Sequence, residues 1–106
     1  MINKIYSMLG LCMKAGKLAY GSDMCEENIK NKKAKILIIA VDTSDNTKKK
    51  FENICARENT ELFFFGDIDS ISHSIGKSNK AIIAILDDGF ANKIKDMLKE
   101  LKGANI

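Results

Sequence analysis

Residues 36–41 read Ile-Leu-Ile-Ile-Ala-Val, a continuous apolar run that is rich in β-branched side chains. Such a run predicts a strand buried on both faces, because a strand with one solvated face alternates apolar and polar residues. The next residues, 42–45, read Asp-Thr-Ser-Asp, and residues of these types are typical helix caps. The stretch therefore predicts a strand that leads into a helix, the repeating unit of an α/β protein.

The segments on both sides of this strand continue the alternation. Apolar residues recur at steps of three and four over residues 2–13, which predicts an amphipathic helix that ends at Gly16. Similar patterns predict helices at 22–31, from 42–45 to near Asn59, at 68–75 and at 90–101, and strands at 17–20, 61–65 and 81–86. The order α-β-α-β-α-β-α-β-α predicts an α/β fold, a three-layer α/β/α sandwich with helices on both faces of a mostly parallel or mixed sheet.

Length and composition indicate one globular domain. The chain has 106 residues, of which 45% are hydrophobic and 29% are charged, so it can bury a core and we expect a single domain over residues 1–106. Its longest apolar run is far shorter than the ~18–20 residues that span a bilayer, and the first residues show no separate signal region. We therefore expect a cytoplasmic protein with no membrane partner.

The reactive side chains suggest no common catalytic or metal chemistry. Cys12, Cys25 and Cys55 are widely spaced and His73 is the single histidine, so the ligands of a usual zinc site are lacking. A cysteine nucleophile paired with His73 is formally open, but each cysteine falls in an apolar helical pattern that is typical of a small buried thiol. Phosphate-binding glycine loops and a nucleophile elbow are lacking as well. We therefore expect no cofactor, no small-molecule substrate and no enzymatic activity.

Acidic residues follow three of the predicted strands. Asp42, Asp67 and the pair Asp87-Asp88 lie where ligands often bind in open α/β sheets. Together they could hold Mg²⁺, as in a receiver domain or a phosphoryl-transfer enzyme. Alternatively, each acid caps the helix that follows, because a carboxylate near a helix N-terminus is favourable by about 0.3–1 kcal/mol. A helical pattern follows each acid, which favours capping.

Positive charge is concentrated in the first third of the chain. The formal net charge is +3, but residues 1–35 carry seven lysines and three acids, whereas the other 71 residues carry ten basic and eleven acidic residues. This asymmetry suggests a polyanionic partner. Lys14 and Lys17 flank one turn, and a second turn at 21–23 opens a helix whose free N–H groups suit an anion. Residues 77–80, Lys-Ser-Asn-Lys, form a second basic loop that could contact phosphates and bases, although both segments also fit ordinary polar turns.

Several stretches resemble the kink-turn RNA-binding ribosomal protein superfamily (L-seven-Ae and L-thirty-e type), and most closely its bacterial YlxQ-like branch. They are Leu-Gly-Leu at 9–11, Lys-Ala-Gly-Lys at 14–17, Gly21, Ala-Lys at 34–35 with the strand that follows, residues 42–50, Ile-Gly-Lys at 75–77 and residues 87–93. The resemblance implies a sandwich with a four-stranded mixed sheet. It also implies binding to a kink-turn, a sharply bent RNA duplex with tandem sheared G·A pairs.

The resemblance assigns roles to particular residues. In the family, the start of the second helix enters the RNA major groove, which the kink opens although regular A-form RNA keeps it narrow. Here the turn at 21–23 would read the RNA, Lys14 and Lys17 would neutralise phosphates, and the loop at 76–79 would pack on the flipped-out nucleotide. Lys33 lies in a stretch, 30–35, with four lysines that would add affinity by counterion release or only solvate a helix end. The implied RNA-binding residues are Lys14, Lys17, Gly21, Ser22, Asp23, Lys33, Gly76, Lys77, Ser78 and Asn79.

Three residues of the second helix depart from the pattern of the strongest kink-turn binders. Where those proteins have Asn, Glu and Lys, this chain has Asp23, Met24 and Glu27. Asp23 accepts hydrogen bonds but donates none, and Glu27 would weaken binding by about 1–2 kcal/mol if it faces a phosphate. A protein-interaction or ribosome-assembly module that has lost kink-turn readout is therefore the alternative. Otherwise we expect a monomer that binds structured RNA, with ribosomal RNA among the candidates.

Overall fold

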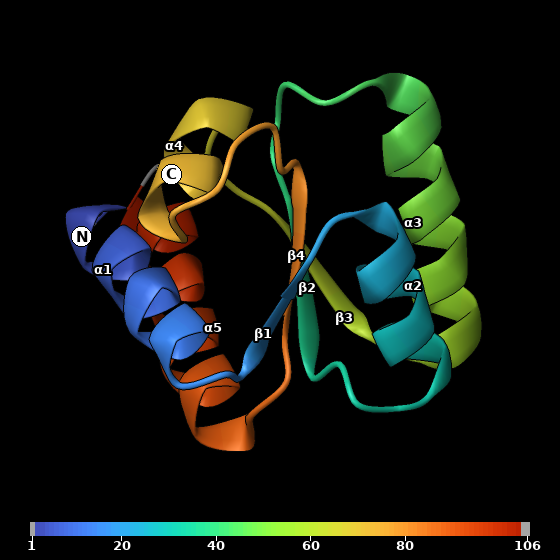
Figure 1. Cartoon of the computed structure of the whole chain (residues 1–106), viewed down its shortest axis with the longest axis horizontal. Helices are drawn as coiled ribbons and strands as arrows, with labels where there is room; N and C mark the ends of the chain where they lie inside the picture. Colours follow the sequence, from blue (N-terminus) through green and yellow to red (C-terminus); the bar gives the residue numbers. More distant parts are fainter. Residues whose placement is uncertain (1, 105–106) are drawn as a thin grey trace.

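The structure follows the predicted alternation of helices and strands. The computed structural model describes residues 2–104, within which five helices surround one four-stranded sheet (Figure 1). The helices are α1 (Ile2–Lys14), α2 (Ser22–Lys30), α3 (Asp45–Glu58), α4 (Ile68–Ser74) and α5 (Asp88–Ala104). The strands are β1 (Leu18–Tyr20), β2 (Ile36–Ile39), β3 (Glu61–Phe64) and β4 (Ile82–Ile85). All nine predicted elements are confirmed in type and order.

The sheet is mixed, and its strand order is β1-β4-β2-β3. β2 and β3 are parallel, whereas β4 is antiparallel to both of its neighbours, β1 and β2. The carboxyl ends of β2 and β3 therefore lie at one end of the sheet, and the carboxyl end of β4 lies at the opposite end. The directions of the strands therefore determine which of the predicted site residues lie close together.

Helices cover both faces of the sheet, as the three-layer prediction requires. α1, α4 and α5 pack on one face, and α2 and α3 pack on the other (Figure 1). Along β2, Ile36 and Ile38 belong to the first core, whereas Leu37 and Ile39 belong to the second. All four side chains are buried. The continuous apolar run is thus explained by a strand that contributes to two cores at once.

The third helix shows how the sequence fixes the ends of an element. The Ser44 hydroxyl accepts a hydrogen bond from the Thr47 N–H and caps the start of α3, and Asn59 ends the helix in the left-handed conformation with a φ of 61°. Between them, Phe51 lies on the buried face. The amphipathic pattern predicts these bounds because one face packs and the other stays solvated. None of the helices within residues 2–104 combines the length and the apolar character that crossing a membrane requires.

Each strand is shorter than predicted by one or two residues: β3 ends at Phe64 in place of Phe65, and β4 spans Ile82–Ile85 in place of 81–86. β2 ends at Ile39, and Val41 is 52% exposed although the apolar run includes it. The Val41 N–H donates to the carbonyl oxygen of Gly66, so the chain there already turns toward the loop before α4. β1 begins at Leu18, one residue later than predicted, and Lys17 belongs to the preceding turn.

Candidate nucleic-acid interface

The acidic residues after the strands are helix caps and do not form a joint metal site. The Asp67 carboxylate accepts from the Ser70 N–H at 3.1 Å, and the Asp87 carboxylate accepts from the Phe90 N–H at 2.9 Å. Hydrogen bonds from Ser70 also lower the pKa of Asp67. Asp42 accepts from the Ile68 N–H at 2.9 Å and so caps α4 in place of its own following helix. Because β4 is antiparallel to β2, Asp87 and Asp42 lie at opposite ends of the sheet. The Mg²⁺ alternative, which needs these acids together, is wrong.

The cysteines are buried thiols and not nucleophiles. Cys12, Cys25 and Cys55 are all free and buried, whereas His73 is exposed. Burial raises the pKa of Cys12 to about 11, with a smaller contribution from the charge of Asp87, and raises the pKa of Cys55 to about 11. Burial also raises the pKa of Cys25 to about 12. The thiolate is the reactive form, so these side chains are held in the unreactive form, as the apolar helical pattern predicts.

The turn that opens α2 is uncovered and depends on a glycine. Gly21 has a φ of 88° and a ψ of 159°, a conformation that is essentially restricted to glycine. Its N–H donates to the Ile82 carbonyl oxygen at 2.9 Å, which ties the turn to β4. Gly21 is the N-cap residue and offers no side-chain cap to the first N–H groups of α2, and Ser22 and Asp23 are exposed. The turn is thus an open helix N-terminus, where backbone N–H groups favour an anion.

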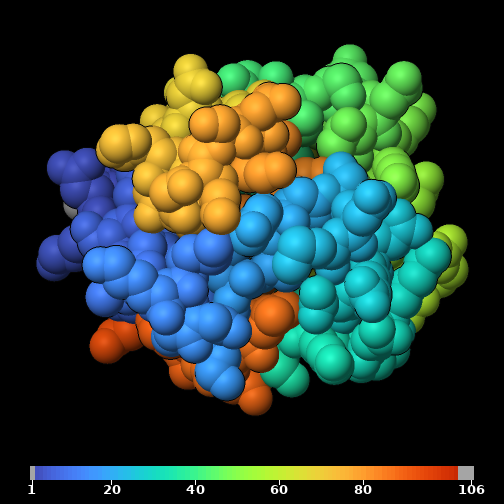
Figure 2. Space-filling view, in the orientation of Figure 1, coloured from blue at the N-terminus to red at the C-terminus, as the bar shows by residue number. Residues whose placement is uncertain are grey.

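The basic loop before β4 lies beside this turn. Lys77 and Lys80 both extend over the ring of Tyr20, with their Nζ atoms 5.2 Å and 5.5 Å from its centroid. Tyr20 directly precedes the Gly21 turn. Figure 2 shows the orange residues around position 80 against the light-blue residues around position 20, on the face toward the viewer. Residues 21–23 and 76–79, predicted as two separate parts of one site, are therefore adjacent and all face outward except the half-buried Gly21.

The remaining predicted lysines lie further from the turn. The Lys17 carbonyl oxygen accepts from the Leu86 N–H, so Lys17 is at the opposite end of β1 from Gly21, about 13 Å away along an extended strand. Lys14 lines one shallow hollow together with Gly76 and so lies near the start of the loop before β4. Lys33 follows the C-terminal end of α2, near Lys35, whose N–H donates to Ile85. The structure thus separates Lys17 and Lys33 from the residues at the turn.

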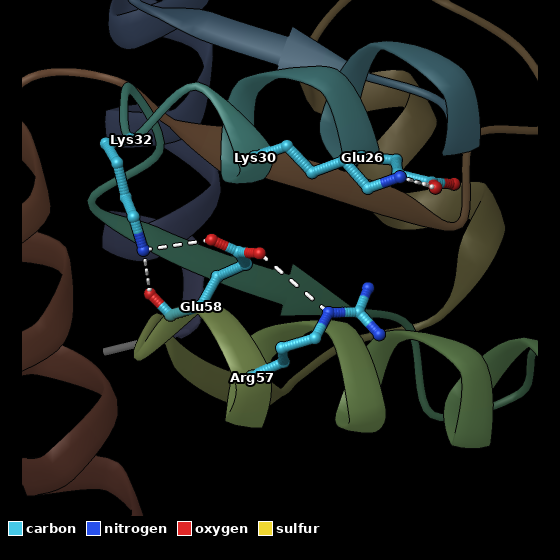
Figure 3. A network of polar contacts seen from close by, with 5 residues as sticks. All are labelled: Glu26, Lys30, Lys32, Arg57 and Glu58. Carbon is cyan, nitrogen blue, oxygen red and sulfur yellow. Dashed lines mark hydrogen bonds and ion pairs between the residues drawn. The ribbon is translucent and has the colours of Figure 1, made fainter.

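Ion pairs reduce the charge that the lysine-rich stretch can offer. Lys30 pairs with Glu26 at 2.9 Å, and Lys32 pairs with Glu58 at 2.9 Å (Figure 3). Glu26 also pairs with Lys50 of α3 at 3.2 Å. Hydrogen bonds from these lysines lower the pKa values of Glu26 and Glu58. Lys30 is therefore paired within α2, whereas Lys32 and Lys50 link α3 to the segment after α2 and to α2 itself.

The outer face of α2 is acidic. Asp23, Glu26 and Glu27 line a shallow hollow there together with Lys30 and Asn31, and Glu27 is exposed. Met24 is 44% exposed in the first turn. The open turn is therefore bordered by carboxylates along its own helix and by ammonium groups from the loop before β4. A polyanion can approach this turn favourably only from the side of Lys77 and Lys80.

Two residues at this place, Tyr20 and Ser72, are outside the predicted set, and Lys80 belongs to the predicted basic loop at 77–80 but not to the residues that the resemblance implies. Tyr20 adjoins a predicted segment in sequence, and an aromatic residue between two basic segments is a weak signal that could have been used. Ser72 of α4 is buried and bonded to Lys80. Nothing in the sequence distinguishes this serine from the other polar residues of a short helix.

Comparisons with known proteins agree on one family. The model of the ribosomal protein L7Ae/L30e/S12e/Gadd45 family matches residues 3–95. An RNA-binding protein YlxQ from Enterococcus faecium is 38% identical over 96 residues, which is 91% of this chain and 92% of that protein. An RNA-binding protein YlxQ from Bacillus subtilis (strain 168) is 33% identical over 96 residues, which is 88% of this chain and 93% of that protein.

Solved structures show the same fold. A protein with unknown function from Bacillus halodurans C is 26% identical with a TM-score of 0.87, over 91% of this chain and 97% of that one. A Giardia lamblia 15.5kD RNA binding protein has a TM-score of 0.77 over 95% of this chain and 87% of that one. Its sequence identity is 14%, so this likeness concerns the fold alone. The predicted sandwich with a four-stranded mixed sheet is confirmed.

Proposed function

Because the chain belongs to the ribosomal protein L7Ae/L30e/S12e/Gadd45 family, we propose that it is a non-enzymatic RNA-binding protein that recognises a kink-turn. The N-terminus of α2 would enter the RNA groove, and the loop before β4 would hold the flipped-out nucleotide. The relatives from Enterococcus faecium and Bacillus subtilis are named RNA-binding proteins, which supports an RNA partner. The observation that carries the proposal is the adjacency of the open turn at 21–23 and the basic loop at 76–80.

The chemistry of the turn suits a helical RNA that has been opened by a kink. Free N–H groups at the start of α2 and the ammonium group of Lys77 attract phosphates. Ser22 can donate or accept a hydrogen bond, whereas Asp23 can only accept one, so Asp23 would pair with amino or imino groups of bases. A regular A-form groove is too narrow for this contact. Such a site therefore favours kinked RNA over a plain duplex.

The basic residues outside the turn would bind the stems of the RNA. Lys14 and Lys17 are exposed at the end of α1 and in the turn after it, and their separation from Gly21 fits contacts to phosphates beyond the bases that the turn reads. Lys33 is exposed at the far end of α2 and would contact a phosphate still further along a stem. These contacts would supply salt-dependent affinity and no sequence information.

The acidic face of α2 supports a second candidate, a protein-interaction or assembly module of the same fold. Asp23, Glu26 and Glu27 line one hollow on α2, and Met24 of the same helix is exposed. Carboxylates repel phosphates, whereas carboxylates and an exposed apolar side chain on one helix suit a basic protein partner. This candidate predicts no measurable RNA binding near physiological salt.

The double variant Lys14→Ala/Lys17→Ala is expected to bind a kink-turn hairpin RNA less tightly than the wild type. Its plot of log K against log salt should be less steep by about 1.4–1.8, because each lost phosphate contact removes about 0.7–0.9 from the slope. Gel shifts at about 50 mM and about 200 mM salt measure both quantities. Lys93→Ala/Lys99→Ala, with two exposed lysines of α5, is the matched control and should behave as wild type.

A control RNA separates the two candidate functions. It carries Watson–Crick pairs in place of the tandem G·A pairs, and the wild type should bind it more weakly than the kink-turn. Equal affinity for the two RNAs contradicts kink-turn readout. Undetectable binding of both RNAs would leave the interaction module as the better account. An unchanged affinity of the Lys14→Ala/Lys17→Ala variant would show that the interface is elsewhere.

A further inference from the structure

One buried serine fixes both ends of the loop before β4. Ser72 is 3% exposed, and its hydroxyl accepts a hydrogen bond from the Lys80 N–H at 2.7 Å. The same hydroxyl donates to the Lys80 carbonyl oxygen at 3.2 Å. The Ser72 carbonyl oxygen accepts from the Lys77 N–H at 2.9 Å. Because both ends of the segment 77–80 are bonded to a single residue of α4, the backbone of this loop is held in one arrangement.

The held loop directs two like charges to one aromatic ring. Asn79 has a φ of 55°, so the chain turns between Lys77 and Lys80, and the side chains of both lysines reach Tyr20. Both ammonium groups lie within 6 Å of the Tyr20 ring centroid, the range of a cation–π interaction. Within the described part of the chain, neither of these lysines takes part in an ion pair. The ring therefore gathers two positive charges that no carboxylate neutralises.

We propose that Tyr20, Lys77 and Lys80 form a clamp for a single phosphate group of the bound RNA, an inference that rests on the proposed function. An anionic oxygen between two ammonium groups relieves their mutual repulsion, so the site gains most from one shared anion. Tyr20 and Ser72 are positioning residues: the ring gathers the two side chains and the serine holds the backbone. Since Tyr20 adjoins Gly21, the clamped phosphate lies next to the nucleotides at the α2 turn.

The clamp contacts the RNA backbone in preference to a base. The Lys77 and Lys80 ammonium groups lie 5.2 Å and 5.5 Å from the centroid of the Tyr20 ring, so a base that stacked on a ring face over which an ammonium group lies would have to displace that group. Phosphate contacts carry no sequence information. The contribution of this loop to affinity is therefore salt-dependent and insensitive to the identity of the flipped-out nucleotide.

The number of phosphates that the two lysines share is measurable. In Lys77→Ala/Lys80→Ala, the slope of log K against log salt for the kink-turn hairpin should fall by about 0.7–0.9, the value for one phosphate, whereas two independent contacts would remove about 1.4–1.8. Tyr20→Leu should weaken binding about two- to fivefold, the range of an exposed cation–π contact. Tyr20→Phe keeps the ring face and should remain within about twofold of the wild type. Thermal melting of each variant checks that it folds.

Several outcomes overturn the clamp while the proposed function stands. In the first, the wild type prefers the kink-turn, but Lys77→Ala/Lys80→Ala either leaves the slope of log K against log salt unchanged or lowers it by about 1.4–1.8, the amount for two phosphates. Another is an affinity that changes more than about tenfold with the base at the flipped-out position. In a third, the NMR signals of Tyr20 shift on titration with inorganic phosphate, but Lys77→Ala/Lys80→Ala binds RNA as tightly as the wild type. This result would assign the site to free phosphate. A wild type that binds no RNA overturns the proposed function first, and the clamp with it.

Discussion

Replacing Phe51 with alanine is expected to lower the free energy of unfolding by about 3–5 kcal/mol. Phe51 is 0% exposed and fills the core between the sheet and the layer of α2 and α3. Its removal loses the transfer free energy of the ring and leaves a cavity that rigid neighbours do not close. Urea unfolding, followed by far-UV circular dichroism, measures the change as a lower midpoint with an unchanged slope.

Phe64→Ala is the matched control for this substitution. Phe64 is the same residue type on the edge strand β3, and it is 44% exposed. The Phe64 side chain buries less apolar area on folding than that of Phe51, so its replacement should lower the free energy of unfolding by less than about 1.5 kcal/mol. Equal losses for the two variants would contradict the difference in burial between Phe51 and Phe64.

Gly21→Ala is expected to weaken binding to the kink-turn hairpin at least about tenfold and to lower the free energy of unfolding by about 1–3 kcal/mol. The φ of 88° and ψ of 159° at Gly21 are strained for any residue with a Cβ atom. An added Cβ has nothing within 4 Å, so the cost comes from the backbone alone. The turn can relax only by redirecting the first N–H groups of α2 away from the position that the proposed RNA contact requires. Gel shifts and urea unfolding measure the two effects.

Asn59→Ala separates the loss of stability from the loss of binding. Asn59 is also left-handed, with a φ of 61°, and lies at the end of α3. Its replacement should cost about 1–2 kcal/mol of stability, because alanine tolerates this conformation poorly, and should leave RNA affinity unchanged. A Gly21→Ala protein that binds RNA as tightly as the wild type would refute the role of the α2 turn.

The fold was predictable because its signals are local. The apolar run at 36–41 indicates a strand with two buried faces, and it contains β2. Cap residues such as Ser44 and Asp67 mark helix starts, and they bond as predicted. Such signals depend on the periodicity of one segment and on the chemistry of one turn.

The candidate site was less predictable because it depends on strand order. The direction of β4 in the sheet decides that Asp87 lies far from Asp42, and no local pattern encodes that direction. The separation of Lys17 from the turn at Gly21 has a local cause, because the extended strand β1 lies between them. Contacts such as those of Lys77 and Lys80 with Tyr20 join segments about sixty residues apart. The sequence thus suggests the segments of the candidate interface, but their mutual geometry depends on the order and direction of the strands.

The pairing of β1 with β4 sets the time at which the interface can form during synthesis. Ala19 of β1 pairs with Ala84 of β4, and the Gly21 N–H donates to the carbonyl oxygen of Ile82, which is synthesised much later. A ribosome that adds roughly 5–20 residues per second needs about 3–13 s to synthesise the chain from Ala19 to Ala84. A nascent chain that lacks β4 therefore has no anchored turn at Gly21, and the candidate interface can form only after residues 82–85 have emerged.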